Sequence, residues 1–109
     1  MPESSERGAL TEAVYYILLA LFHPMHGYGI MQYVTEMSSG RVVLGPGTLY
    51  GAISTMLEKK WIEAVSGDKD SRKKEYKITH LGIEITQAET ARLRELFENG
   101  EKVLGGMER

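Results

Sequence analysis

The segment GPGTLYGAISTMLEKKW, from Gly45 to Trp61, constrains this chain more than any other part of it. On a helix from Pro46 to Lys60, one stripe at helical spacing holds the apolar residues Leu49, Ile53, Met56 and Leu57. The opposite face holds only small or hydroxylated residues, namely Gly47, Thr48, Gly51, Ser54 and Thr55. Exposed helix faces usually carry Lys, Glu, Gln and Arg, and each glycine costs a helix about 1 kcal/mol relative to alanine. A face so small indicates that another molecule or element approaches it closely.

Two kinds of partner fit such a face. Small residues let a second protein helix pack closely, and they also let a helix enter the major groove of DNA, which is just wide enough to admit one. In DNA, Gly47 and Gly51 would allow close approach to the bases, and the N–H groups at the helix start would suit a phosphate. The side chains expected to donate to phosphates or base edges are Thr48, Tyr50, Ser54 and Thr55. We favour DNA and keep helix packing as the alternative.

The chemistry that the sequence lacks narrows the function further. Its 109 residues, 42% hydrophobic and 26% charged, are ordinary for one soluble domain. The chain has no cysteine, which excludes disulfides, thiolate metal sites and cysteine nucleophiles. Its three histidines show no metal-ligand spacing, HGYG is not a dinucleotide fingerprint, and no serine–histidine–acid pattern is present. We therefore expect no catalytic residues, no metal, no cofactor and no enzyme activity.

Charge is distributed unevenly along the chain. The net charge is −2 overall, but it is −3 over residues 1–40, +3 over residues 41–80 and −2 over residues 81–109. Electrostatic binding depends on local patches, so the middle third is the part expected to face a polyanion. Arg72, Lys73 and Lys74 are consecutive there, in a turn with Asp68 and Asp70. We favour contact between the basic run and phosphates over a merely solvated turn, with the two aspartates pointing away.

The hydrophobic and turn patterns give an order of elements. They predict helices over residues 11–22 and 26–37, a short strand at 41–44 and the helix at 46–60. Two strands around WIEAVS and RKKEYKIT follow, and then a helix over residues 81–104, ended by Gly105 and Gly106. Three helices before a hairpin with a charged tip are the layout of a winged helix-turn-helix. We predict a mainly α fold with a small β-hairpin: a DNA-binding domain over residues 1–80 and a long C-terminal dimerisation helix over residues 81–109.

Two apolar surfaces indicate a homodimer. The run AVYYILLALF is apolar all round, so both of its faces need a cover, either from a second element or from a second subunit. The last helix presents an apolar arc that is broad for so small a domain, although it could fold back over its own core. We favour packing against a symmetry mate. The residues expected at this contact are Val14, Ile17, Leu18, Leu81, Ile85, Leu93, Leu96 and Phe97.

No segment of the sequence predicts a membrane protein. The longest apolar run, residues 13–22, is about half as long as a membrane span. The N-terminus also lacks the basic and then apolar pattern of a signal peptide. We expect a cytoplasmic protein without membrane contact.

The segments HGYGI, GTLYGAISTMLEKKWI and RKKEYKITHLG resemble, in this order and spacing, the signature segments of PadR-type transcriptional regulators over residues 10–85. The single helix after the hairpin is similar to that of the smaller subfamily. The resemblance implies a homodimer, usually a repressor, that binds a palindromic operator. It places the helix matching Pro46 to Lys60 in the major groove and the wing matching Ser66 to Lys74 on phosphates.

Some members of that family bind flat aromatic or lipophilic compounds between subunits, against a tryptophan of the last helix. The resemblance therefore implies a small-molecule effector at the dimer interface, although the only tryptophan here, Trp61, lies elsewhere. A winged-helix adaptor that binds proteins and not DNA is the alternative function. Salt-dependent binding to duplex DNA distinguishes the two.

Overall fold

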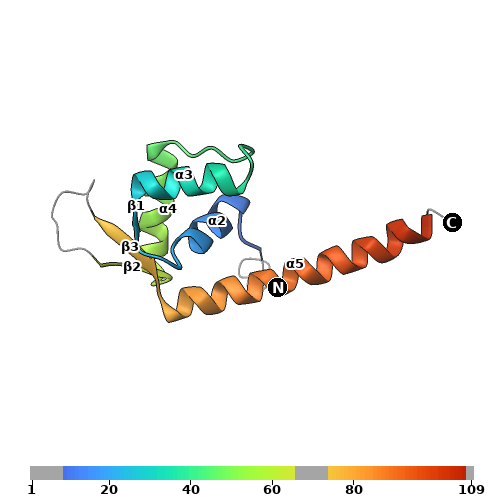
Figure 1. Cartoon of the computed structure of the whole chain (residues 1–109). Coiled ribbons are helices and arrows are strands. Elements are labelled where there is room, and N and C mark those ends of the chain that lie inside the picture. Colours follow the sequence, from blue (N-terminus) through green and yellow to red (C-terminus); the bar gives the residue numbers. More distant parts are fainter. Residues whose placement is uncertain (1–8, 66–73, 108–109) are drawn as a thin grey trace.

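A computed structural model describes residues 9–65 and 74–107 of the chain. The elements in chain order are α2 (Glu12–Ala20), β1 (Met25–His26), α3 (Gly27–Met37), α4 (Pro46–Glu58), β2 (Ile62–Ala64), β3 (Glu75–Ile78) and α5 (His80–Met107). The strands form an antiparallel sheet in the order β1-β3-β2. Figure 1 shows α2, α3 and α4 grouped beside this sheet, while α5 runs along the group and extends far past it. The mainly helical fold with a small sheet is the one that the sequence predicts.

The core lies where the three short helices meet the sheet. Its fully buried members include Ile17, Leu18, Leu21, Ile30, Val34, Leu49, Met56 and Ile62. The apolar stripe predicted for α4 is confirmed, since Leu49, Ile53 and Met56 are buried and Leu57 is partly buried. Helix α2 contacts both α3 and α5. Both apolar faces of α2 are therefore packed, at least in part, against helices of the same chain.

The segment HGYGI begins α3 and joins it to α4. His26 is the N-cap residue, and its Nδ1 accepts a hydrogen bond from the backbone N–H of Gly29 at 3.4 Å. Gly27 is buried, and a Cβ at this position would overlap the phenol of Tyr50 from α4. Because glycine has no side chain, the Tyr50 ring can lie against the first turn of α3. Gly27 thus allows the two helices of the helix-turn-helix to pack closely.

Helix α4 ends in a Schellman motif. The N–H of Lys60 bonds to the carbonyl of Leu57 at 3.1 Å, and the N–H of Trp61 bonds to the carbonyl of Met56 at 3.0 Å. Lys60 has a φ of 64°, in the left-handed region that glycine adopts more easily. This turn directs the chain from α4 straight into β2.

The start of α5 is attached to the end of α4 through Thr79. The Thr79 N–H donates to the carbonyl of Trp61 at 2.9 Å. Its hydroxyl accepts from the N–H of Gly82 at 3.1 Å, and it donates toward the carbonyls of Lys60 and Trp61, at 2.7 and 3.0 Å. Thr79 is thus the side-chain cap of α5 and also the link between α5 and the turn that ends α4.

Further along, α5 packs on α2 and on the segment before it. The hydroxyls of Tyr15 and Thr90 are 2.6 Å apart. Glu89 is almost fully buried and accepts hydrogen bonds from the guanidinium of Arg92, at 2.8 and 2.6 Å, and from the N–H of Leu10 at 3.3 Å. The Arg92 hydrogen bond lowers the pKa of Glu89; burial acts in the opposite direction, and the Leu10 N–H lowers the pKa further.

None of the helices in residues 9–65 and 74–107 has the length and apolar content needed to cross a bilayer.

Two local predictions are wrong, and one strand was not predicted. Residues 41–44 form no strand, because the N–H of Val42 bonds to the Ser38 hydroxyl at 2.9 Å and no neighbouring strand takes it. The third strand is β1, whose two residues are too few to show an alternating pattern. Helix α5 does not end at residue 104 but continues through Gly105 and Gly106 to Met107.

Candidate nucleic-acid interface

Helix α4 turns its short side chains away from the core. The residues of this face, Gly47, Thr48, Gly51, Ser54 and Thr55, are all exposed. A Cβ added at Gly47 or Gly51 would meet no atom within 4 Å. Within the residues that the structure describes, nothing packs at these two glycines. No element within the described residues fills the role of the packed helix in the alternative interpretation.

The first turn of α4 is open as well. Gly45 is the N-cap residue and gives no side-chain hydrogen bond, and Pro46 at the first helical position has no N–H. The N–H groups of Gly47 and Thr48 belong to the first turn, where a helix has no intrahelical acceptors for them. Such N–H groups and the positive end of the helix dipole favour an anion.

The four hydroxyl-bearing residues of α4 are not equivalent. Thr48 and Ser54 are exposed. The Thr55 hydroxyl donates to the Gly51 carbonyl at 3.2 Å, so it already has a partner within the helix. Tyr50 is half-buried, with its phenol beside Gly27 of α3. Tyr50 therefore supports the packing of α3 on α4 and lies at the edge of the exposed face.

The hairpin of β2 and β3 is the wing of the fold. Its register pairs Ile62 with Ile78 and Ala64 with Tyr76, and β2 contacts α4. Burial raises the pKa of Tyr76, whose ring belongs to the core, and Tyr50 raises it further. Of the predicted basic run, Arg72 and Lys73 lie outside the described residues, whereas Lys74 is half-buried directly before β3.

The start of α3 lies between the wing and α4, a placement that the sequence alone did not indicate. Strand β1 pairs His26 with Glu75, at the end of β3 nearest the loop of the wing, and Gly27 lies against Tyr50 of α4. Tyr28 in the same turn is 64% exposed, and its hydroxyl accepts a hydrogen bond from the amide of Gln32 at 3.4 Å. The sequence signal that could have indicated this residue is the tyrosine placed between the two glycines of HGYGI. Tyr28 extends the candidate interface from α4 onto α3.

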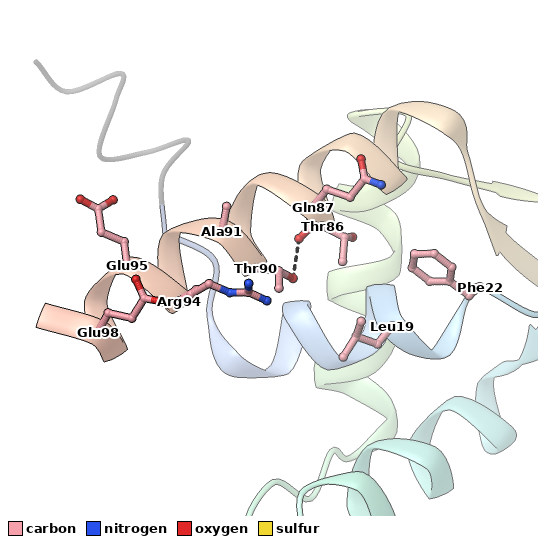
Figure 2. A pocket seen from close by; sticks show the side chains of 9 residues that line it. All are labelled: Leu19, Phe22, Thr86, Gln87, Thr90, Ala91, Arg94, Glu95 and Glu98. Atoms are coloured by element: carbon pink, nitrogen blue, oxygen red, sulfur yellow. Dashed lines mark hydrogen bonds between the residues drawn. The ribbon is translucent and has the colours of Figure 1, made fainter. Parts of the chain in front are cut away.

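A second surface combines α2 and α5. Between them lies a groove of about 560 Å³. Figure 2 shows Leu19 and Phe22 on the α2 side of this groove, and Thr90 and Arg94 on the α5 side. Beyond this groove, α5 carries several exposed apolar residues: Leu81, Leu93, Leu96, Phe97, Val103, Leu104 and Met107.

The residues predicted for a dimer contact differ in how exposed they are on the single chain. Ile17 and Leu18 have no exposed surface, because they point into the core of their own chain. Val14 and Ile85 are half-buried. The α2 side of the groove is formed instead by Leu19 and Phe22.

Over residues 9–65 and 74–107, no three His, Asp or Glu side chains are grouped as a metal site would require.

The family model described as "Transcriptional regulator PadR-like family" matches residues 16–88 of the chain. Among solved structures, a PadR-like transcription factor from Bacteroides fragilis is similar, with a TM-score of 0.64 and 23% identity over 94% of this chain and 97% of that one. A transcriptional regulator from Clostridium thermocellum gives a TM-score of 0.61 and 21% identity over 91% and 93% of the two chains. At these identities, the likeness shows the fold. Comparison with curated proteins gave no match.

Proposed function

Because the chain belongs to the PadR-like family of transcriptional regulators, we propose that it binds a palindromic DNA operator as a homodimer and represses transcription. The main support is the exposed face of α4, which is open at Gly47 and Gly51. In this proposal α4 enters the major groove with Gly47, Thr48, Gly51, Ser54 and Thr55 toward the bases and Tyr50 at its edge. Arg72, Lys73 and Lys74 contact phosphates.

A charge placed on this face tests the proposal. The space around Gly51 is empty, so Gly51→Glu should fold and should even favour the helix. In the groove, however, the carboxylate would meet the phosphates and take the space that the bases need. We expect no binding to an operator selected from random DNA, at protein concentrations that saturate the wild type.

Gly105→Glu is the matched control, because Gly105 is also an exposed helical glycine with no atom near its would-be Cβ. It should bind as the wild type does, by fluorescence anisotropy. A folded Gly51→Glu protein that binds normally would remove α4 from the interface. DNA binding that is absent from the wild type, or that does not weaken with salt, would favour the protein-binding adaptor instead.

The second part of the proposal is the homodimer. Along α5 the exposed apolar residues form two groups at separations of three and four, Leu93, Leu96 and Phe97 and then Val103, Leu104 and Met107. Leu96 and Val103 are seven residues apart, as are Phe97 and Leu104, so the two groups lie on one stripe of the helix, as in a helix that packs against another helix. The stripe continues onto the part of α5 that extends past the body (Figure 1). A second copy that covers the stripe and the groove between α2 and α5 would bury both surfaces. The two-fold symmetry then predicts an inverted-repeat operator.

Leu96→Glu tests the dimer. Leu96 is 54% exposed, so the change should leave the folded chain intact while placing an unpaired charge in the proposed contact. We expect a monomer by light scattering and loss of operator binding. Glu101→Ala, on the same helix, is the control and should remain a dimer. A wild-type monomer at micromolar concentration that binds its operator tightly would contradict the proposal.

The proposal also includes a place for regulation and a compartment. A small-molecule effector is proposed to enter the dimer interface along the groove between α2 and α5, where Leu19 and Phe22 offer apolar contacts. No tryptophan is available on α5 for such a contact, since the only one in the sequence is Trp61. As a regulator of transcription, the protein is expected to act in the cytoplasm and not as an enzyme.

A further inference from the structure

The turn that follows α4 and the first turn of α5 are connected directly by one side chain. The hydroxyl of Thr79 is 2.7 Å from the Lys60 carbonyl and accepts from the Gly82 N–H at 3.1 Å. The backbone N–H of Thr79 adds a bond to the Trp61 carbonyl at 2.9 Å. One hydroxyl therefore directs its proton to the turn after α4, toward the carbonyls of Lys60 and Trp61, and offers a lone pair to the start of α5.

The same joint has no spare room. Gly82 is buried, and a Cβ there would overlap the carbonyl oxygen of Trp61 and meet the Ile78 side chain at 2.6 Å. The first turn of α5 thus lies flat against the backbone that leaves α4. Further along, the Tyr15–Thr90 pair holds α5 to α2 and the Glu89 carboxylate holds it to the N–H of Leu10, and neither of these attachments involves α4.

The length of α5 makes the angle at this joint important. Leu96, in the proposed dimer contact, follows Thr79 by 17 residues, which corresponds to about 26 Å along a helix. A tilt of about 8° at the joint would move that point by about 3.5 Å, which is close to the rise of one base pair. The two copies of α4 in a dimer must match the separation of two half-sites on DNA. A small change of angle would therefore alter which separations fit.

We propose that Thr79 is a positioning residue that sets the half-site spacing the dimer accepts. The inference rests on the proposed function, because it presumes operator binding by a dimer through α4. By holding Lys60 and Gly82 together, the Thr79 hydroxyl restricts the angle between α4 and α5. Without that hydroxyl the angle is less restricted, and operators with neighbouring spacings compete better with the preferred one.

Two variants of Thr79 and one control test this. Thr79→Val keeps the shape and removes the hydroxyl, whereas Thr79→Ser keeps the hydroxyl. Thr35→Val is the matched control, because the Thr35 hydroxyl donates only to the Met31 carbonyl of its own helix, at 3.1 Å. For each protein, Kd is measured by anisotropy on inverted repeats whose spacer is the preferred one, or is shorter or longer by one or two base pairs.

The readout is the ratio of Kd at a neighbouring spacing to Kd at the preferred spacing. Thr79→Val should lower this ratio about fivefold, which corresponds to the net contribution of one hydrogen bond. Thr79→Ser and Thr35→Val should keep the wild-type ratio. A Thr79→Val protein that binds more weakly at every spacing with an unchanged ratio has only lost stability, and this outcome overturns the inference.

Gly82→Ala provides a second measurement that does not depend on the valine variant folding. Its Cβ would push the first turn of α5 away from the Trp61 carbonyl, so the preferred spacing should shift. An unchanged preferred spacing overturns the inference and leaves the proposed function intact. A wild type that binds DNA but distinguishes no spacing overturns the inference and the proposed operator geometry together.

Discussion

Glu89 should make the stability of this protein depend on pH in the acid range. Its side chain is 3% exposed, and both carboxylate oxygens accept hydrogen bonds from Arg92, one of them also from the Leu10 N–H. The Arg92 hydrogen bond is the main cause that lowers the pKa of Glu89, and it outweighs the burial that would raise it. Protonation of Glu89 is therefore harder in the folded chain than in the unfolded one.

The sign of the effect follows from linkage. A carboxyl group whose pKa is lower in the folded state stabilises the fold above its unfolded pKa, and this contribution is lost as the pH falls through the folded pKa. Hydrogen bonds to a charged group contribute about 1.5–3 kcal/mol, and the partial exposure of Arg92 reduces this. We expect Glu89→Gln to lower the free energy of unfolding by about 2 kcal/mol at neutral pH. The difference from wild type should persist down to about pH 4.5 and shrink below it.

Urea unfolding followed by circular dichroism measures this difference at several pH values. The protomer concentration must be the same throughout, because dimer formation would add to the apparent stability. Glu101→Gln, an exposed substitution on the same helix, is the control and should change little at any pH. The reasoning is refuted if Glu89→Gln differs from wild type by the same amount in neutral and acid solution.

Three further predictions address other contacts. Lys60→Gly should raise the free energy of unfolding by about 1 kcal/mol, seen in the urea midpoint, because Lys60 has a φ of 64°. Gly27→Ala should lower it by about 1–3 kcal/mol because the Cβ overlaps the phenol of Tyr50, and adding Tyr50→Leu should restore part of the loss. Changing Lys73 and Lys74 to alanine should weaken binding to operator and random DNA alike and flatten the salt dependence by about 0.9 per lost phosphate contact; an unchanged slope would exclude both lysines.

The elements with a clear period or a clear cap were predictable from the sequence. In α4, the residues Leu49, Ile53 and Met56 have helical spacing, and each is buried. The start of α3 followed from HGYGI and the two wing strands from the alternation on either side of the charged turn. These features depend on local spacing, which a single sequence displays.

The remaining features depend on contacts between distant residues. The run around Ile17 and Leu18 is apolar on all sides, so its sequence does not indicate which side of the helix faces the core. It therefore could not show that Ile17 and Leu18 are buried while Leu19 and Phe22 border the groove. The Ser38 hydroxyl that takes the N–H of Val42 removes a strand that β-propensity alone would favour. The three-residue separation of Glu89 and Arg92 is enough to suggest an ion pair on one helix face. The burial of Glu89, however, depends on the segment before α2, where the Leu10 N–H donates to its carboxylate.

The distal half of α5 has a consequence for how much of this protein a cell must make. It carries Gly100, Gly105 and Gly106, each of which costs a helix about 1 kcal/mol relative to alanine, and it extends past the body of the domain (Figure 1). A helical stretch of this length is marginal without a partner. In the proposed dimer, formation of this helix and pairing of the chains are one equilibrium that depends on protein concentration. When most chains are unpaired, halving their number lowers the amount of dimer about fourfold, so regulation by this protein would be sensitive to gene dosage.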